Sequence, residues 1–253
     1  MDLGIAGKLA IVTASSGGLG DAVAHALAAE GVHLALFARS EDRLRANAAA
    51  IEQRYKVRAL PVAGDMRSRK DVERLVAEVA REFGGPDILV LNTGRPPLPT
   101  REVLDETEDE RWEEAYRTQL WAAILVARAV APLLAQRGWG RIIAITSASV
   151  KQPMSSHGLS TVFRAGVTGL MKHLANEIAS QGVTVNTVCP ASIATEGLRM
   201  SYDLSERIKR VPVGRVGRPE ELAAVIAFLA SDLAGFITGA SIQVDGGMVG
   251  ALC

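Results

Sequence analysis

Short runs of apolar residues alternate with longer amphipathic segments along the whole chain, and this alternation restricts the fold more than any other feature. Most of the seven runs are apolar at nearly every position, which is typical of strands buried on both faces of a parallel sheet. The runs lie at residues 8–14, 33–39, 58–65, 87–94, 140–147, 183–190 and 241–247. Segments with helical spacing lie between them, at 19–30, 40–55, 68–83, 109–137, 161–181 and 219–231. The sequence therefore predicts an α/β fold, a doubly wound Rossmann-type sheet of seven mainly parallel strands with helices on both faces.

Composition narrows the possible classes of protein. No repeat, low-complexity tract or Gly/Ser linker divides the 253 residues, so we expect one domain over 1–253. Basic and acidic residues balance at 28 each, which predicts neither nucleic acid nor an anionic membrane as a partner. Cys189 and Cys253 form no C-x-x-C pair and the four histidines have no ligand spacing, so we expect no metal. No leader-like N-terminus and no run of membrane-spanning length is visible, which indicates a cytoplasmic protein.

A glycine-rich turn follows the first predicted strand, with the sequence Thr-Ala-Ser-Ser-Gly-Gly-Leu-Gly at 13–20. Between a first strand and a first helix, such a turn lets the backbone approach a pyrophosphate at the positive end of the helix. The candidate cofactor residues here are Thr13, Ser15, Ser16, Gly18 and Leu19. The alternative is a turn that serves packing alone.

The end of the second predicted strand reads Phe-Ala-Arg-Ser at 37–40, with no carboxylate at its tip. A carboxylate there would accept hydrogen bonds from the ribose 2′-OH of NAD, whereas an arginine favours the 2′-phosphate of NADP. Arg39 and Ser40, with Arg43 nearby, therefore favour NADP over NAD. The alternative is an ordinary solvated arginine at a helix start.

Three further segments extend the pattern, Gly64-Asp65-Met66, Asn92-Thr93-Gly94 and the stretch 190–195. With the glycine turn, they make the chain resemble the classical short-chain dehydrogenase/reductase family, in particular its 3-oxoacyl-carrier-protein reductase-like members. The resemblance runs from residue 8 to residue 247. It implies that the cofactor is also bound by a set of later residues: Asp65, Met66, Asn92, Gly94, Arg164, Pro190, Ile193 and Thr195. Two glycines of the family pattern are alanines here, Ala14 and Ala191.

The resemblance also implies a catalytic Tyr-x-x-x-Lys pair directly before Ala165-Gly166. This chain has Ser160 and Arg164 at those two places, so it is a divergent member without the pair. Ser147 stands at the position of the family's carbonyl-polarising serine, and Gln119 stands at that of its asparagine. A serine hydroxyl is a much weaker acid than a phenol, and a guanidinium keeps its proton. The expected catalytic positions are thus Ser147, Ser160, Arg164 and Gln119, with an altered proton relay.

Several alternatives remain open at this stage. His157 and Tyr202 are other possible acids. The simpler interpretation of His157 is a surface histidine in a loop, and that of Tyr202 is an aromatic side chain that covers an apolar surface. Ser147 has a second interpretation as a helix cap. The loops 95–105, 149–158 and 196–214 are expected to set the substrate, and the last of them to form a lid.

Three functions fit these residues. The first is an NADP-dependent oxidoreductase acting on a ketone or secondary alcohol, the second a non-catalytic ligand-binding pseudo-enzyme, and the third a non-redox enzyme on the same fold. The resemblance implies a homo-oligomer, a dimer or tetramer, with small or apolar faces on two long helices. Those faces are Ala122, Ala123, Val126 and Ala129 on one helix, and Gly166, Gly169 and Leu170 on the other.

Overall fold

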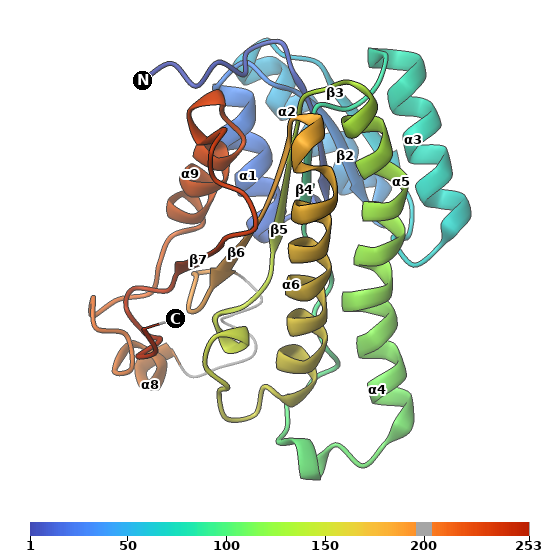
Figure 1. Ribbon diagram of the computed structural model, residues 1–253. Helices are drawn as coiled ribbons and strands as arrows, with labels where there is room; N and C mark the ends of the chain where they lie inside the picture. Colours follow the sequence, from blue (N-terminus) through green and yellow to red (C-terminus); the bar gives the residue numbers. More distant parts are fainter. Residues whose placement is uncertain (196–203, 253) are drawn as a thin grey trace.

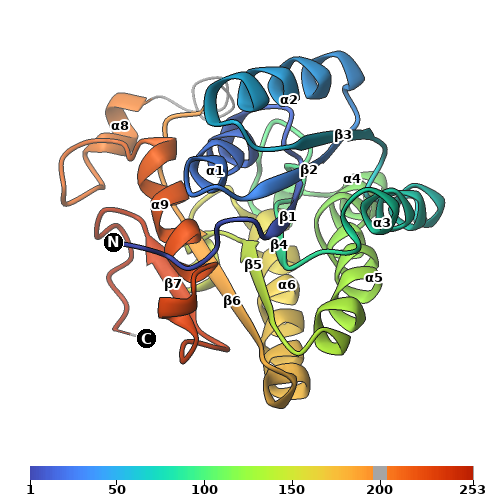
Figure 2. The same cartoon turned by 90° about the horizontal axis from the view of Figure 1, so that it is seen from above.

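A seven-stranded sheet forms the centre of the computed structural model, which describes residues 1–195 and 204–252 (Figures 1 and 2). The strands are β1 (Leu9–Thr13), β2 (His33–Ala38), β3 (Ala59–Ala63), β4 (Ile88–Leu91), β5 (Gly140–Ile145), β6 (Val183–Pro190) and β7 (Ser241–Val244). Their spatial order is β3-β2-β1-β4-β5-β6-β7, and every neighbouring pair is parallel. The predicted fold class is confirmed.

Helices cover both faces of this sheet, as Figure 2 shows from above. The α-helices are α1 (Gly18–Ala29), α2 (Glu41–Tyr55), α3 (Arg69–Phe83), α4 (Asp109–Ala115), α5 (Ala122–Gln136), α6 (Gly158–Ile178), α8 (Leu204–Ile208) and α9 (Pro219–Leu229). One hydrophobic core joins α1, α2 and α9 to one face of the sheet, and a second joins α3, α5 and α6 to the other.

The apolar runs are explained by these two cores. Neighbouring residues of a strand point to opposite faces, so Val12 belongs to the core under α1 and Ile11 to the core under α5. Both side chains are fully buried. Each position of a central strand therefore has to be apolar, which is why the runs do not alternate.

The long predicted helix 109–137 is one continuous helical stretch, but it is not α-helical throughout. A π-helical turn, η2 (Tyr116–Trp121), lies between α4 and α5. By length and composition the stretch Asp109–Gln136 could cross a membrane, so the expectation that no run reaches that length is wrong. Half of its most apolar window is buried inside the protein, as in a core helix.

The expected oligomer face on α5 needs a correction. Ala122, Ala123 and Val126 are at most 1% exposed and pack against the sheet, so they cannot meet another subunit. Ala129 is half-buried, and on α6 Gly169 is exposed. Small apolar residues allow close packing against a sheet as well as against another subunit, so residue type alone does not identify the outer face of α5.

The order of the strands places a crevice at one edge of the sheet. β1 lies between β2 and β4. The chain passes from β1 to β2 on one side of it, and returns from β3 to β4 on its other side. In open parallel sheets, ligands bind at this switch point, outside the carboxyl ends of the strands.

Candidate functional site

A cavity of about 700 Å³ lies at the carboxyl ends of β1 to β5. That volume is within the range of small-molecule and cofactor sites. Eleven of the expected cofactor residues line it: Ser16, Gly18, Leu19, Arg39, Ser40, Asp65, Met66, Asn92, Gly94, Arg164 and Thr195. Lining residues that the sequence reasoning did not single out as contacts include Arg67, Arg95, Glu114, Thr118, Ile145 and Thr146.

The turn between β1 and α1 forms one wall of this cavity. Ala14 has a φ of 49°, a left-handed conformation that disfavours side chains. Gly20 is required here, because a Cβ on it would lie 2.5 Å from the carbonyl oxygen of Ala14. Gly17 is the N-cap of α1, and none of the described side chains caps that helix. Its first N–H groups are therefore available to an anion in the cavity.

The end of β2 supplies positive charge. Arg39 and Ser40 are exposed at the rim, and Arg43 follows them on the first turn of α2. Among the described residues, neither arginine has an ion pair with a carboxylate. Their charges are thus free to meet an anionic group of a ligand.

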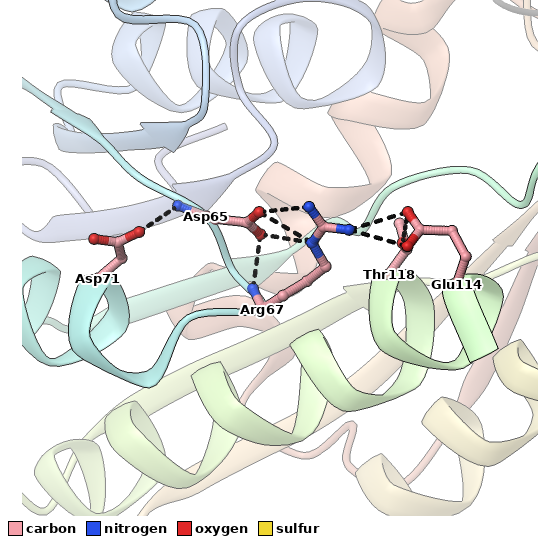
Figure 3. Close-up of polar contacts among 5 residues, drawn as sticks. All are labelled: Asp65, Arg67, Asp71, Glu114 and Thr118. Carbon is pink, nitrogen blue, oxygen red and sulfur yellow. Dashed lines mark hydrogen bonds and ion pairs between the residues drawn. The ribbon is translucent and has the colours of Figure 1, made fainter. Parts of the chain in front are cut away.

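Asp65, Arg67 and Glu114 form a linked set of ion pairs along another wall (Figure 3). Arg67 donates from Nε and Nη2 to the Asp65 carboxylate at 2.8–3.1 Å, and from Nη1 to both Glu114 oxygens at 3.0 and 3.1 Å. Burial alone would raise the pKa of Asp65, but the hydrogen bonds and charge of Arg67, together with the charge of Arg39, outweigh it and lower that pKa. The Thr118 hydroxyl donates to Glu114 at 3.0 Å.

Four expected cofactor residues lie behind the cavity rather than on its surface. Thr13 is buried, and its hydroxyl donates to the Asn92 carbonyl at 2.7 Å and accepts from the Asn92 N–H at 2.9 Å. The buried Ser15 hydroxyl has no hydrogen-bond partner among the described residues. The other two, Pro190 and Ile193, are buried at and beyond the end of β6. They shape the cavity without lining it.

Arg164 lies at the deep end of the cavity, on α6. It is buried and donates to the carbonyl oxygens of Ile145 at 2.7 Å and Gly94 at 3.2 Å. No described carboxylate pairs with it, and burial lowers the pKa of its guanidinium to about 10. It is still a cation at neutral pH, held by two carbonyl dipoles in the absence of a counter-ion.

Gln119 lies in the π-helical turn and is fully buried. Neither its amide nitrogen nor its amide oxygen has a hydrogen-bond partner within the described ranges. Buried amides are almost always satisfied, so this group is available to a ligand or an ordered water. The adjacent Thr118 packs so tightly on Gly94 that a Cβ at Gly94 would overlap its methyl group.

Ser147 is half-buried at the end of β5 and begins the short helix η3 (Ala148–Val150). Its oxygen accepts from the backbone N–H of Ser149 at 3.2 Å and from the Ser149 hydroxyl at 3.0 Å. The cap interpretation is thus correct. Because both acceptor positions of the oxygen are in use, the Ser147 proton remains for donation elsewhere.

Ser160 faces a different place from Arg164. It lines a second, much smaller cavity between the start of α6 and the loop 95–106, with Pro96 and Pro97 opposite. That loop is joined to the segment before α6 by the Glu102 carboxylate, which accepts from the Ser156 N–H at 2.7 Å. The four expected catalytic residues are therefore not gathered in one cavity.

His157 is poorly placed to act as an acid. Arg207 can only donate, so its 3.0 Å contact requires His157 Nε2 to accept, and Nδ1 then donates to the Ser155 carbonyl at 2.8 Å. Burial, together with the charge of Arg207, lowers the pKa of His157. The other alternative, Tyr202, lies outside the described residues. Within the described ranges, no group of three or more His, Cys, Asp or Glu is placed to hold a metal ion.

Comparison with known proteins adds a second line of argument. Residues 13–249 match a family model described as enoyl-(acyl carrier protein) reductase. The 3-oxoacyl-[acyl-carrier-protein] reductase of Haemophilus influenzae is 34% identical over 246 residues, 96% of this chain and 98% of the relative. Nodulation protein G of Azospirillum brasilense is 32% identical over 243 residues, covering 95% and 98%. A crystal structure of L-sorbose reductase from Gluconobacter frateurii, complexed with NADPH and L-sorbose, has a TM-score of 0.92, 34% identity and full coverage of both chains.

Proposed function

Because this chain belongs to the short-chain dehydrogenase/reductase family, we propose that it is an NADP-dependent oxidoreductase acting on a ketone or secondary alcohol. In this proposal it resembles the 3-oxoacyl reductases in overall chemistry and differs from them in its proton relay.

The observation that carries the proposal is the cavity at the carboxyl ends of β1 to β5. One wall is a glycine turn with an uncapped helix N-terminus, which suits a pyrophosphate. Another carries Arg39 and Arg43 without carboxylate partners among the described residues, which suits a 2′-phosphate. The L-sorbose reductase of similar structure was solved with NADPH. The donor set therefore fits NADPH better than NADH.

We assign the remaining contacts along the length of the cavity. Ser16, Gly18 and Leu19 hold the pyrophosphate, and Asp65 with Met66 lies along the adenine. A last group lies around the nicotinamide half: Asn92, Gly94, Arg164 and Thr195. Thr13, Ser15, Pro190 and Ile193 support these contacts from behind.

When bound, the reduced nicotinamide supplies a hydride to the carbonyl carbon of the substrate. Ser147 donates its free proton in a hydrogen bond to the carbonyl oxygen and polarises it. Arg164 stabilises the negative charge that develops on that oxygen, because its buried cation has no carboxylate partner within the described ranges. It remains protonated at neutral pH and is not itself the acid. In this proposal a water molecule gives a proton to the alkoxide and is reprotonated from solvent, and the buried, unpartnered amide of Gln119 orients that water.

Ser160 contributes to substrate recognition in this scheme rather than to proton transfer, since it faces the loop 95–106. We further propose that residues 1–253 form one dinucleotide-binding domain, and that the protein is cytoplasmic and assembles as a homo-oligomer, a dimer or tetramer.

The same position of Ser160 favours a second candidate. If no proton can reach the substrate, the chain is a pseudo-enzyme that binds a dinucleotide or another ligand without turnover. A third candidate, a non-redox enzyme on this fold, needs no acid at this position.

A fluorescence titration of the purified protein with NADPH and, in parallel, NADH separates these functions. Tight NADPH binding and weak NADH binding supports the proposal and leads to a screen of ketone substrates for NADPH oxidation. Binding without turnover on any ketone supports the pseudo-enzyme. Absence of binding for both dinucleotides rejects the oxidoreductase proposal.

A further inference from the structure

Resting on the proposed dinucleotide function, we propose that Arg67 is a purine-binding residue whose planar guanidinium stacks against the adenine ring of the cofactor. Arg67 lies directly after the adenine-side pair Asp65 and Met66, and it lines the cavity.

The in-plane edges of the Arg67 guanidinium are already occupied by carboxylates. An arginine head group is flat, with all its N–H donors in one plane. Here Nε and Nη2 face the Asp65 carboxylate and Nη1 faces the Glu114 carboxylate, as Figure 3 shows. Because these in-plane N–H groups are already hydrogen-bonded, Arg67 can bind a further partner through the two faces of its guanidinium plane. A flat aromatic ring is the ligand that an arginine face binds.

The wall formed by Asp65, Arg67 and Glu114 is negatively charged. One guanidinium and two carboxylates carry a net charge of −1, so this wall disfavours a phosphate group. Arg39 and Arg43 line the same cavity and form no ion pair with a described carboxylate, and the charge of Arg39 acts on the neighbouring Asp65 only at longer range. The phosphate and the purine are therefore directed to different arginines, and Arg67 takes the uncharged ring.

The Arg67 guanidinium is held in place before a ligand arrives. The backbone N–H of Asp65 donates to the Asp71 carboxylate at 3.0 Å, and the Thr118 hydroxyl holds Glu114 at 3.0 Å. Arg67 thus bridges the end of β3 and the helix α4, and its side chain is only 33% exposed. A pre-organised side chain loses little entropy on binding, so the stacking contact contributes more to affinity.

The test compares Arg67→Lys with Arg74→Lys in the full-length protein. Lysine keeps the charge at 67 but has no planar face. Arg74 has a similar pair of carboxylate partners, Asp71 and Glu78, and does not line the cavity. We expect Arg67→Lys to raise the Kd for NADPH and for NADH alike by about threefold to tenfold. Reduced nicotinamide mononucleotide, which has no purine, should bind unchanged, and Arg74→Lys should change none of the three.

Several outcomes would overturn the inference while leaving the proposed function intact. These are an unchanged NADPH Kd in Arg67→Lys, a tighter complex, or an equal loss for the mononucleotide. Failure of the wild-type protein to bind NADPH rejects the proposed function instead. Apo melting temperatures of the variants show whether they are folded.

A second variant keeps the inference testable if Arg67→Lys fails to fold. Glu114→Gln removes one negative charge and retains the Arg67 plane, so adenosine, which carries no phosphate, should bind as it does to the wild type, whereas NADPH should gain affinity relative to NADH through charge alone. Loss of adenosine binding in this variant would show that Glu114, rather than the Arg67 plane, makes the purine contact, and it would refute stacking.

Discussion

Replacing Ala14 by glycine should stabilise this protein, although it removes a methyl group from a half-buried position. Ala14 has a φ of 49°, and a side chain in the left-handed region costs about 1–2 kcal/mol. Glycine offsets part of that gain, because the unfolded chain becomes more flexible, by about 0.4–1 kcal/mol. The net increase in the free energy of unfolding is therefore roughly 0.5–1 kcal/mol. In a chain of 253 residues this corresponds to a Tm higher by about 1–4 °C.

Urea denaturation and thermal melts of the apo protein measure this difference. Lys56→Gly is the matched control, since Lys56 has a φ of 60° at the exposed C-cap of α2 and does not line the cavity. Both variants should be more stable than the wild type. A stabilised Lys56→Gly together with a destabilised Ala14→Gly would refute the claim that backbone strain dominates at Ala14.

Three further predictions concern the site. Arg39→Ala should raise the NADPH Kd by about 10- to 100-fold through the loss of a charge-assisted hydrogen bond, with little effect on NADH, as fluorescence titration would report. The double variant Ser160→Tyr with Arg164→Lys should create or increase ketone reductase activity in an NADPH oxidation assay. Unchanged zero turnover with intact NADPH binding would argue against a reductase cleft. The lowered pKa of His157 means that the unfolded chain binds a proton more readily than the folded protein. Stability should therefore fall as the pH drops below about 6.5, and chemical denaturation should show a smaller fall in His157→Gln.

The fold could be predicted from the sequence because its strands have no polar side. Residues such as Ile11 and Val12 are both buried, each in a different core, and only a sheet covered on both faces requires this. The start of α6 was placed three residues too late. Gly158 is a poor helix former, but a Cβ there would overlap the Val103 side chain in the loop 95–106, and local propensity does not include this tertiary restriction.

The candidate site could be predicted only where a residue's role is local. Arg39 at a strand end and Ser16, Gly18 and Leu19 of the glycine turn were expected on the cavity, and they line it, whereas Thr13 and Ser15 of the same turn lie behind it. Arg67 was missed because its partner Glu114 is 47 residues away and belongs to a helix across the cavity. Ser160 was expected beside Arg164, one helical turn later, yet the loop 95–106 provides it with a separate pocket.

The π-helical turn η2 affects where a residue can be deleted from this chain and where a sequence alignment should allow a gap. It holds an extra residue in its turn, so the helical wheel drawn for α4 is out of phase with that for α5 by about 100°. Removing one residue from 116–121 would bring the two wheels into register and rotate one helix about its axis. Either the contacts of Trp112 and Tyr116 with Phe163 or the burial of Ala122 and Ala123 would then be lost. The stretch Asp109–Gln136 is therefore best treated as two helices sharing one axis, with a gap permitted in alignments at their junction.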